Sequence, residues 1–158
     1  MAFSGYLKID DIEGESKRAD HIGEIIISSF SWGASRSAFR NSGGQRESGL
    51  PEVQSLTLTK DYDASSPYLA LACIKAKNLG EVVLTLRKDQ GDEHSDYLTI
   101  TLTNTLVESY QTGGGGGGNP VDSMSLSFDS IKVKYIQDAD DLTAGGEHEI
   151  EYDVLAAK

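Results

Sequence analysis

Apolar and polar residues alternate along most of this chain, and that pattern constrains its fold more than any other feature. From Tyr97 to Thr103, leucine or isoleucine takes every second position and threonine most of the positions between. Successive side chains of a β-strand point to opposite faces of a sheet, so this segment predicts a strand with one buried and one wet face. The same pattern predicts strands at 82–87, 123–128, 131–136 and 147–154, and others near 5–10, 24–33 and 53–60.

One segment departs from alternation and predicts a short helix over 67–77. Its apolar residues recur at helical spacing, at Leu69, Ala72, Cys73 and Ala76. Ser66-Pro67 offers an N-cap followed by proline at the first helical position, and Asn78 or Gly80 can end the helix. Cys73 is then expected on the core side of the helix as a small apolar side chain.

Three segments predict loops. They are the long stretch 35–51, the run of six glycines from Gly113 to Gly118, and the acidic segment 138–146. Eight or nine strands and one helix on 158 residues predict a single all-β domain over 1–158. We expect a closed or nearly closed β-barrel or sandwich, with the helix covering an open end or face.

Charge, hydrophobicity and cysteine content restrict the kinds of partner that the chain can bind and the compartment in which it is made. The chain carries 25 acidic and 14 basic side chains, a formal net charge of −11, and a phosphate backbone would repel such a surface. We therefore expect no nucleic-acid partner. No apolar run reaches the ~18 residues that a transmembrane helix needs, so we expect no membrane insertion. The N-terminus lacks the features of a Sec signal peptide, and the lone Cys73 is compatible with synthesis in the cytoplasm.

Two segments of the sequence say more about function than the alternation does. The first runs from Gly14-Glu15-Ser16 through His21 to Ser31-Trp32-Gly33, and the second from Asp61 to Cys73. Both resemble segments of the Hcp (hemolysin-coregulated protein) family, the inner-tube proteins of the bacterial type VI secretion system. Segments 85–88, 97–102 and 107–113 are also similar to that family's pattern.

The resemblance implies a β-barrel of two antiparallel sheets with a helix on its side. It implies a homohexameric ring with a central channel, and rings that stack into a tube inside a contractile sheath. A trimeric spike protein (VgrG) would sit at the tip, and small effector proteins would be carried in the channel. The protein would wait in the bacterial cytoplasm and then be secreted without a cleaved signal peptide.

Candidate contact residues follow from the resemblance together with alternation. Ser29 and Ser31 share one face of a strand, and Phe30 and Trp32 share the other. If Trp32 points into the core, Ser31 faces outward, and the resemblance implies that it lines the channel and contacts cargo. The alternative is an exposed serine without a role.

The segment 35–51 is the second candidate surface, because it would reach the next ring and set the stacking. Its candidate contact residues are Phe39, Arg40, Asn41, Arg46 and Leu50. The alternative is a disordered surface loop.

The sequence predicts no catalytic residues, no metal and no cofactor. His21, His94 and His148 lie far apart, with no pair at the spacing of metal ligands. The glycine run matches any glycine motif and is followed by Asn119-Pro120, whereas a phosphate-binding loop continues with Lys-Ser or Lys-Thr. The calcium-like start at Asp138 has Thr143 at the position that requires glycine. We expect no enzyme. The runner-up hypothesis is a stand-alone β-sandwich binding module or secreted effector that has kept the fold.

Overall fold

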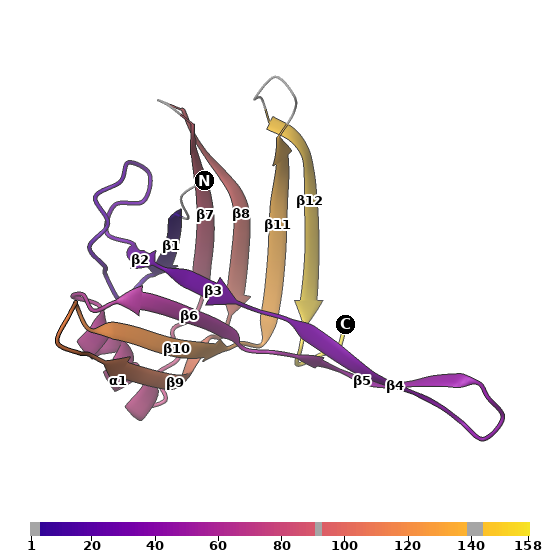
Figure 1. The fold of residues 1–158 in the computed structure, drawn as a ribbon. Coiled ribbons are helices and arrows are strands. Elements are labelled where there is room, and N and C mark those ends of the chain that lie inside the picture. Colours follow the sequence, from indigo (N-terminus) through magenta and orange to yellow (C-terminus); the bar gives the residue numbers. More distant parts are fainter. Residues whose placement is uncertain (1–3, 91–92, 139–143) are drawn as a thin grey trace.

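The computed structural model describes residues 4–90, 93–138 and 144–158 (Figure 1). Within these ranges the chain forms twelve strands and one α-helix. In chain order they are β1 (Ser4–Ile9), β2 (Ile25–Ile27), β3 (Ser29–Ser31), β4 (Ala34–Arg40), β5 (Arg46–Val53), β6 (Leu56–Asp61), α1 (Ser66–Ile74), β7 (Val82–Gln90), β8 (Glu93–Thr103), β9 (Leu106–Gly113), β10 (Val121–Ser127), β11 (Ser130–Asp138) and β12 (Ala144–Asp153).

Six strands form the larger antiparallel sheet, in the order β12-β11-β8-β7-β1-β2. The register runs one apolar row across all six strands, through Ile25, Leu7, Leu84, Ile100, Val133 and Ile150. Ile25, Leu7, Leu84 and Ile100 are buried, Val133 is partly buried, and Ile150 is exposed. The core therefore covers this face of the sheet from β2 to β8 and thins out toward β12.

The second antiparallel sheet has the order β3-β6-β10-β9 and supplies the other side of the core. Leu56 and Leu58 of β6 and Met124 and Leu126 of β10 have almost no exposed surface. Figure 1 shows the strands of this sheet running across those of the larger sheet. The apolar side chains of the two layers meet in one cluster.

The helix α1 lies against β9, and its buried side chains Leu69 and Ala72 join the core cluster. Cys73 packs against that cluster and is partly buried. The N-cap is Ser65, one residue before the predicted one, so Pro67 takes the second helical position. The helix also ends earlier than predicted, at Ile74.

The early helix end has a local cause, because the chain turns at Ala76. This residue has a left-handed backbone with φ of 51°. The Lys77 N–H donates to the Ala72 carbonyl at 3.0 Å, and the Ala76 N–H donates to the Cys73 carbonyl at 3.5 Å. These two bonds form a Schellman motif, which terminates a helix and is usually built on glycine.

A two-stranded ribbon projects from the smaller sheet. β3 leads through Trp32 and Gly33 into β4, and β5 leads through Gln54 into β6, so the β4–β5 hairpin continues the β3–β6 pair. The Gln54 N–H donates to the Gly33 carbonyl at 2.9 Å where the two parts join. Figure 1 shows the hairpin reaching well beyond the two sheets.

The predicted all-β class with two main antiparallel sheets and one short helix is confirmed. The predicted barrel is not closed, because no strand pairing joins the two large sheets among the described residues. The predicted loop 35–51 is wrong, since most of it forms β4 and β5. The glycine run forms the loop between β9 and β10 from Gly114 to Gly118, as predicted, whereas Gly113 is the last residue of β9. Alternation did not predict β9 itself. The calcium-like segment lies largely outside the described residues.

Candidate functional site

The smaller sheet turns a face of small, uncharged polar side chains away from the core. The register aligns two rows across β3, β6, β10 and β9, one of Ser31, Thr57, Ser125 and Ser109, the other of Ser29, Thr59, Ser123 and Gln111. We call these eight residues the hydroxyl face. These eight side chains carry no charge and no large apolar group, so they offer a partner hydrogen bonds but no strong anchor. The next row along the same face pairs Asp61 with Val121, and both are exposed.

Ser31 lies at one end of this face, and its geometry follows the alternation. It is exposed at the end of β3, whereas Phe30 and Trp32 pack against the core cluster. Its Cα partner in β6 is Thr57, whose hydroxyl lies 3.3 Å from that of Ser125. The structure thus places Ser31 among other hydroxyl groups. Its contact with cargo remains a prediction.

The β4–β5 hairpin holds all five of the residues expected to set ring stacking. Every residue of β4 is exposed, and so are most residues of β5. Phe39 is 54% exposed and Leu50 is 90% exposed. An isolated two-stranded hairpin is only marginally stable in water, so exposed apolar groups on both strands favour a partner.

Asn41 orders the tip of the hairpin. Its Oδ1 accepts hydrogen bonds from the Gly43 and Gln45 N–H groups, both at 3.0 Å, and its Nδ2 donates to Glu47 at 3.1 Å. Gly44 has φ of 83°, a left-handed conformation that glycine adopts without strain. The tip is therefore a defined turn and not a disordered loop.

The hairpin is weakly basic in an acidic chain, because its three arginines outnumber Glu47 and Glu52. Arg36, Arg40 and Arg46 are three of the five arginines in the sequence. Arg40 and Arg46 lie directly opposite each other in the ladder. Like charges in that position repel, and an acidic partner surface would relieve the repulsion.

Beneath the hydroxyl face lies a buried ion cluster around Lys60, which alternation placed on a strand but did not single out. Lys60 has no exposed surface, and its Nζ lies 2.9 Å from Asp63 Oδ1 and 3.0 Å from Asp122 Oδ2. The amine also donates to the Ser66 hydroxyl at 2.7 Å. The cluster therefore ties β6 and β10 to the first turn of α1.

The protonation states in this cluster suit a structural role. Burial acts to raise the pKa of Asp122, but hydrogen bonds from Ser66, Thr112 and Lys60 outweigh burial and hold the pKa below 3.8. Burial raises the pKa of Tyr110 to about 12, and the neighbouring Asp122 adds to the rise. At neutral pH Asp122 is thus ionised and Tyr110 neutral, so neither of them is poised for acid–base catalysis.

His21 forms a second structural cluster. Its Nδ1 lies 2.7 Å from Glu24 Oε2 and its Nε2 lies 3.0 Å from Asp96 Oδ1. Its ring stacks on Tyr6 with 4.6 Å between ring centroids. His21 therefore bonds within its own turn through Glu24, and it fastens the segment after β1 to β1 and β8.

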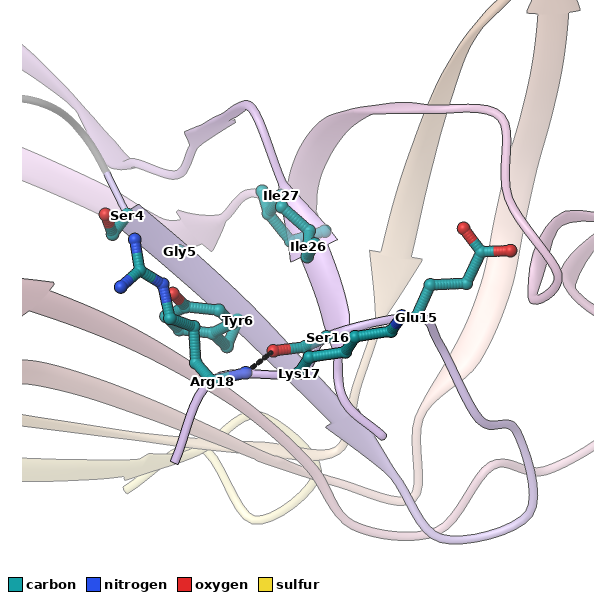
Figure 2. Close-up of a pocket in the computed structure, with 9 residues that line it drawn as sticks. All are labelled: Ser4, Gly5, Tyr6, Glu15, Ser16, Lys17, Arg18, Ile26 and Ile27. Carbon is teal, nitrogen blue, oxygen red and sulfur yellow. Dashed lines mark hydrogen bonds between the residues drawn. The ribbon is translucent and has the colours of Figure 1, made fainter. Parts of the chain in front are cut away.

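A pocket of about 480 Å³ lies beside this cluster (Figure 2). Figure 2 shows the Arg18 side chain beside Tyr6 and Ser4, whereas Lys17 extends toward Glu15. Lys17 and Arg18 are both exposed, so they do not form a desolvated binding site.

The remaining histidines do not join His21. His94 contacts Asp89 and His148 contacts Gln137, on separate parts of the larger sheet. In the described parts of the chain, no three metal-ligating side chains gather to hold an ion. Nor is any helix there long and apolar enough to cross a membrane.

Comparison with known proteins points in one direction. Residues 6–135 match the family described as "Type VI secretion system effector, Hcp". The protein hcp1 of Pseudomonas aeruginosa is 40% identical over 148 residues, covering 92% of this chain and 91% of its own. Two solved structures are similar over nearly all of both chains. A type six secretion system protein has a TM-score of 0.92 at 27% identity, covering 99% of each chain. Hcp1 from Salmonella typhimurium has a TM-score of 0.80 at 28% identity, covering 100% of this chain and 99% of its own.

Proposed function

Because the chain belongs to the Hcp family of type VI secretion system effectors, we propose that six copies close into a ring and that rings stack into the inner tube of the machine. The observation that carries this proposal is the β4–β5 hairpin. It projects beyond both sheets, is exposed on both strands and has an ordered basic tip. Such a hairpin is suited to reach a neighbouring copy.

A closed ring would also cover unpaired strand edges. The larger sheet ends at β2 and β12, and the smaller sheet ends at β3 and β9. Open edges of this kind are sites of aggregation in a monomer. In a ring of identical subunits, each copy uses two different surfaces, one toward each neighbour. Strand edges on opposite sides of one copy can therefore both be covered by the contacts that close the ring.

The stacking role belongs to Phe39, Arg40, Asn41, Arg46 and Leu50. Phe39 and Leu50 supply apolar contact area, and the two arginines meet the acidic surface of the next ring. Asn41 holds the turn that presents them. Because one ring of acidic subunits repels another, a basic hairpin provides the attraction that stacking needs.

The hydroxyl face lines the channel in this proposal, with Ser31 at its end. A channel lining must hold folded cargo and then release it, which favours many weak hydrogen bonds over a few strong anchors. Two rows of serine, threonine and glutamine side chains fit that requirement. The cargo would be small effector proteins.

The remaining partners follow from the tube. A trimeric spike protein (VgrG) would cap it and a contractile sheath would surround it. The chain would be made in the bacterial cytoplasm and leave the cell with the tube. Its role is structural, with no catalytic step.

A label on the hydroxyl face tests this proposal. Ser125→Cys in a Cys73→Ala background provides one thiol on β10, to which a maleimide-linked gold particle is coupled. Negative-stain images of end-on rings should show the gold at the centre of the ring. Gold on the outer rim would contradict the channel assignment, and single particles without rings would favour the stand-alone binding module.

A further inference from the structure

The larger sheet carries an apolar surface that nothing in one copy of the chain covers. Ile150 continues the buried row through Leu84, Ile100 and Val133, but it is 64% exposed. We call four exposed apolar residues here the uncovered sheet end: Tyr135 of β11, Ile150 of β12, and Val154 and Leu155 just after β12. A core face that runs out into solvent marks a surface for a partner.

The helix α1 carries a second such surface on its outer side. Leu69 and Ala72 face the core, while Tyr68, Leu71 and Ile74 are 62%, 47% and 80% exposed. These three residues, spaced three apart, form what we call the helix stripe. The segment Ser66–Ile74 contains no charged residue, and a helix that is apolar all round is normally buried on all sides.

The two surfaces lie on opposite flanks of the molecule. Figure 1 shows α1 at one side, under β9 and β10, and β11 and β12 at the other. A closed ring needs two different surfaces placed in this way, one facing each neighbour. The hairpin is a poorer match than the helix stripe for the uncovered sheet end. It offers two exposed large apolar residues, Phe39 and Leu50, and it projects from the same side of the molecule that carries β12 (Figure 1).

We propose that the helix stripe of each copy packs on the uncovered sheet end of the next copy, and that this contact closes the ring. The inference rests on the ring proposed above and assigns its subunit contact. One continuous apolar layer would then run from the core of one copy into its neighbour, which resembles the interior of a domain cut in two.

Charged residues of opposite sign lie near the two surfaces. Lys75 and Lys77 follow the helix stripe directly. β12 carries Glu147, Glu149, Glu151 and Asp153 on its other face, close to the sheet edge. Lys132 and Lys134 pair with two of these acids, at 3.1 Å from Glu149 and 3.6 Å from Glu147. The acids also discourage direct pairing of β12 with another strand edge, which leaves its apolar face as the docking surface.

Crosslinking in intact rings tests the contact. In a Cys73→Ala background, Ile74→Cys and Ile150→Cys are combined in one chain and treated with a short bismaleimide. The double variant should give a ladder of covalent oligomers up to six chains on denaturing gels, and each single variant should give almost none. Rings of normal mass without the ladder would overturn this contact while leaving the ring proposal intact. A chain that forms no ring at all would remove both.

Paired charge variants give an independent test. Ile74→Asp and Ile150→Asp should each reduce the particle to a monomer, measured by light scattering after size-exclusion chromatography. An equal mixture retains one intact contact, from the helix stripe of the Ile150→Asp chain to the sheet end of the Ile74→Asp chain. Crosslinking that mixture with a short amine-reactive reagent should capture a dimer of two different chains and nothing larger.

An exposed isoleucine outside both surfaces supplies the matched control. Ile22 is 77% exposed, and Ile22→Asp should leave the ring intact. Rings that survive both Ile74→Asp and Ile150→Asp would overturn the proposal, as would a mixture in which crosslinking captures no dimer.

Discussion

Lys60 is a charged residue placed where a strand would ordinarily carry an apolar one. It continues the buried row of Leu56 and Leu58, and its amine is satisfied by Asp63, Asp122 and Ser66. Alternation predicted a strand here but could not predict the cluster, because Asp122 lies on β10, far away in the sequence. The register between β6 and β10 brings Lys60 and Asp122 together, and a single sequence does not reveal that register.

We predict that Lys60→Met destabilises the chain by about 3–5 kcal/mol, because it leaves the carboxylates of Asp63 and Asp122 buried without their cation. Urea denaturation measures the change. The double variant Lys60→Met/Asp122→Leu should recover part of the loss, since it also removes one of the stranded charges. A single variant within about 0.5 kcal/mol of the original would show that the cluster is not paired as described.

Asp122 also predicts how stability depends on pH. Its pKa is lower in the folded chain than its ordinary value of 3.8. The folded state therefore gains stability from Asp122 above that value, and this stability is lost as the pH falls toward the folded pKa. We expect Asp122→Asn to reduce the loss of stability between about pH 5 and pH 3. Urea midpoints at several pH values measure this, and an unchanged slope would contradict it.

At the scale of elements, regions with one buried face were predictable and regions without one were not. β8 and β10 alternate clearly because one face meets the core. The hairpin β4–β5 has water on both faces, so its sequence carries no alternation and was predicted as a loop. The hydroxyl residues of β10 were visible as the polar half of an alternating strand. Their alignment with Thr57 and Ser109 required the sheet register.

The hairpin predicts a separation between ring formation and stacking. Arg40→Glu/Arg46→Glu reverses the charge of the tip, so acidic rings should repel and tubes should not form, while rings keep their mass. Sedimentation and negative-stain images, under conditions where the unaltered chain forms tubes, measure both. Lys17→Glu/Arg18→Glu changes the net charge equally on an exposed segment elsewhere and should leave tubes intact. Normal tubes from the hairpin variant would refute the stacking role.

The C-terminal end of α1 predicts a stabilising substitution. Ala76 adopts φ of 51°, which costs an L-residue about 1–2 kcal/mol and costs glycine almost nothing. Ala76→Gly should therefore raise the free energy of unfolding by about 0.5–1 kcal/mol, after the larger entropy of glycine in the unfolded chain is subtracted. Thermal unfolding checks the direction. A lower midpoint would mean that the turn at Ala76 is built differently.

At the scale of the whole molecule, the chain combines a well-filled core with surfaces that one copy leaves uncovered. The hairpin, the helix stripe and the uncovered sheet end all expose apolar side chains, in a chain whose net charge of −11 would otherwise keep copies apart. Sequence motifs were sufficient to predict the family. They were not sufficient to locate these surfaces, because exposure depends on where the second sheet stops.

The most direct test of the central claim is the mass of the purified particle, measured by light scattering after size-exclusion chromatography over a range of concentrations. We predict a particle six times the 17.0 kDa mass of one chain, stable to dilution, with ring-shaped images from the same peak. A particle of 17.0 kDa at every concentration would contradict the claim that this chain closes into a ring by itself.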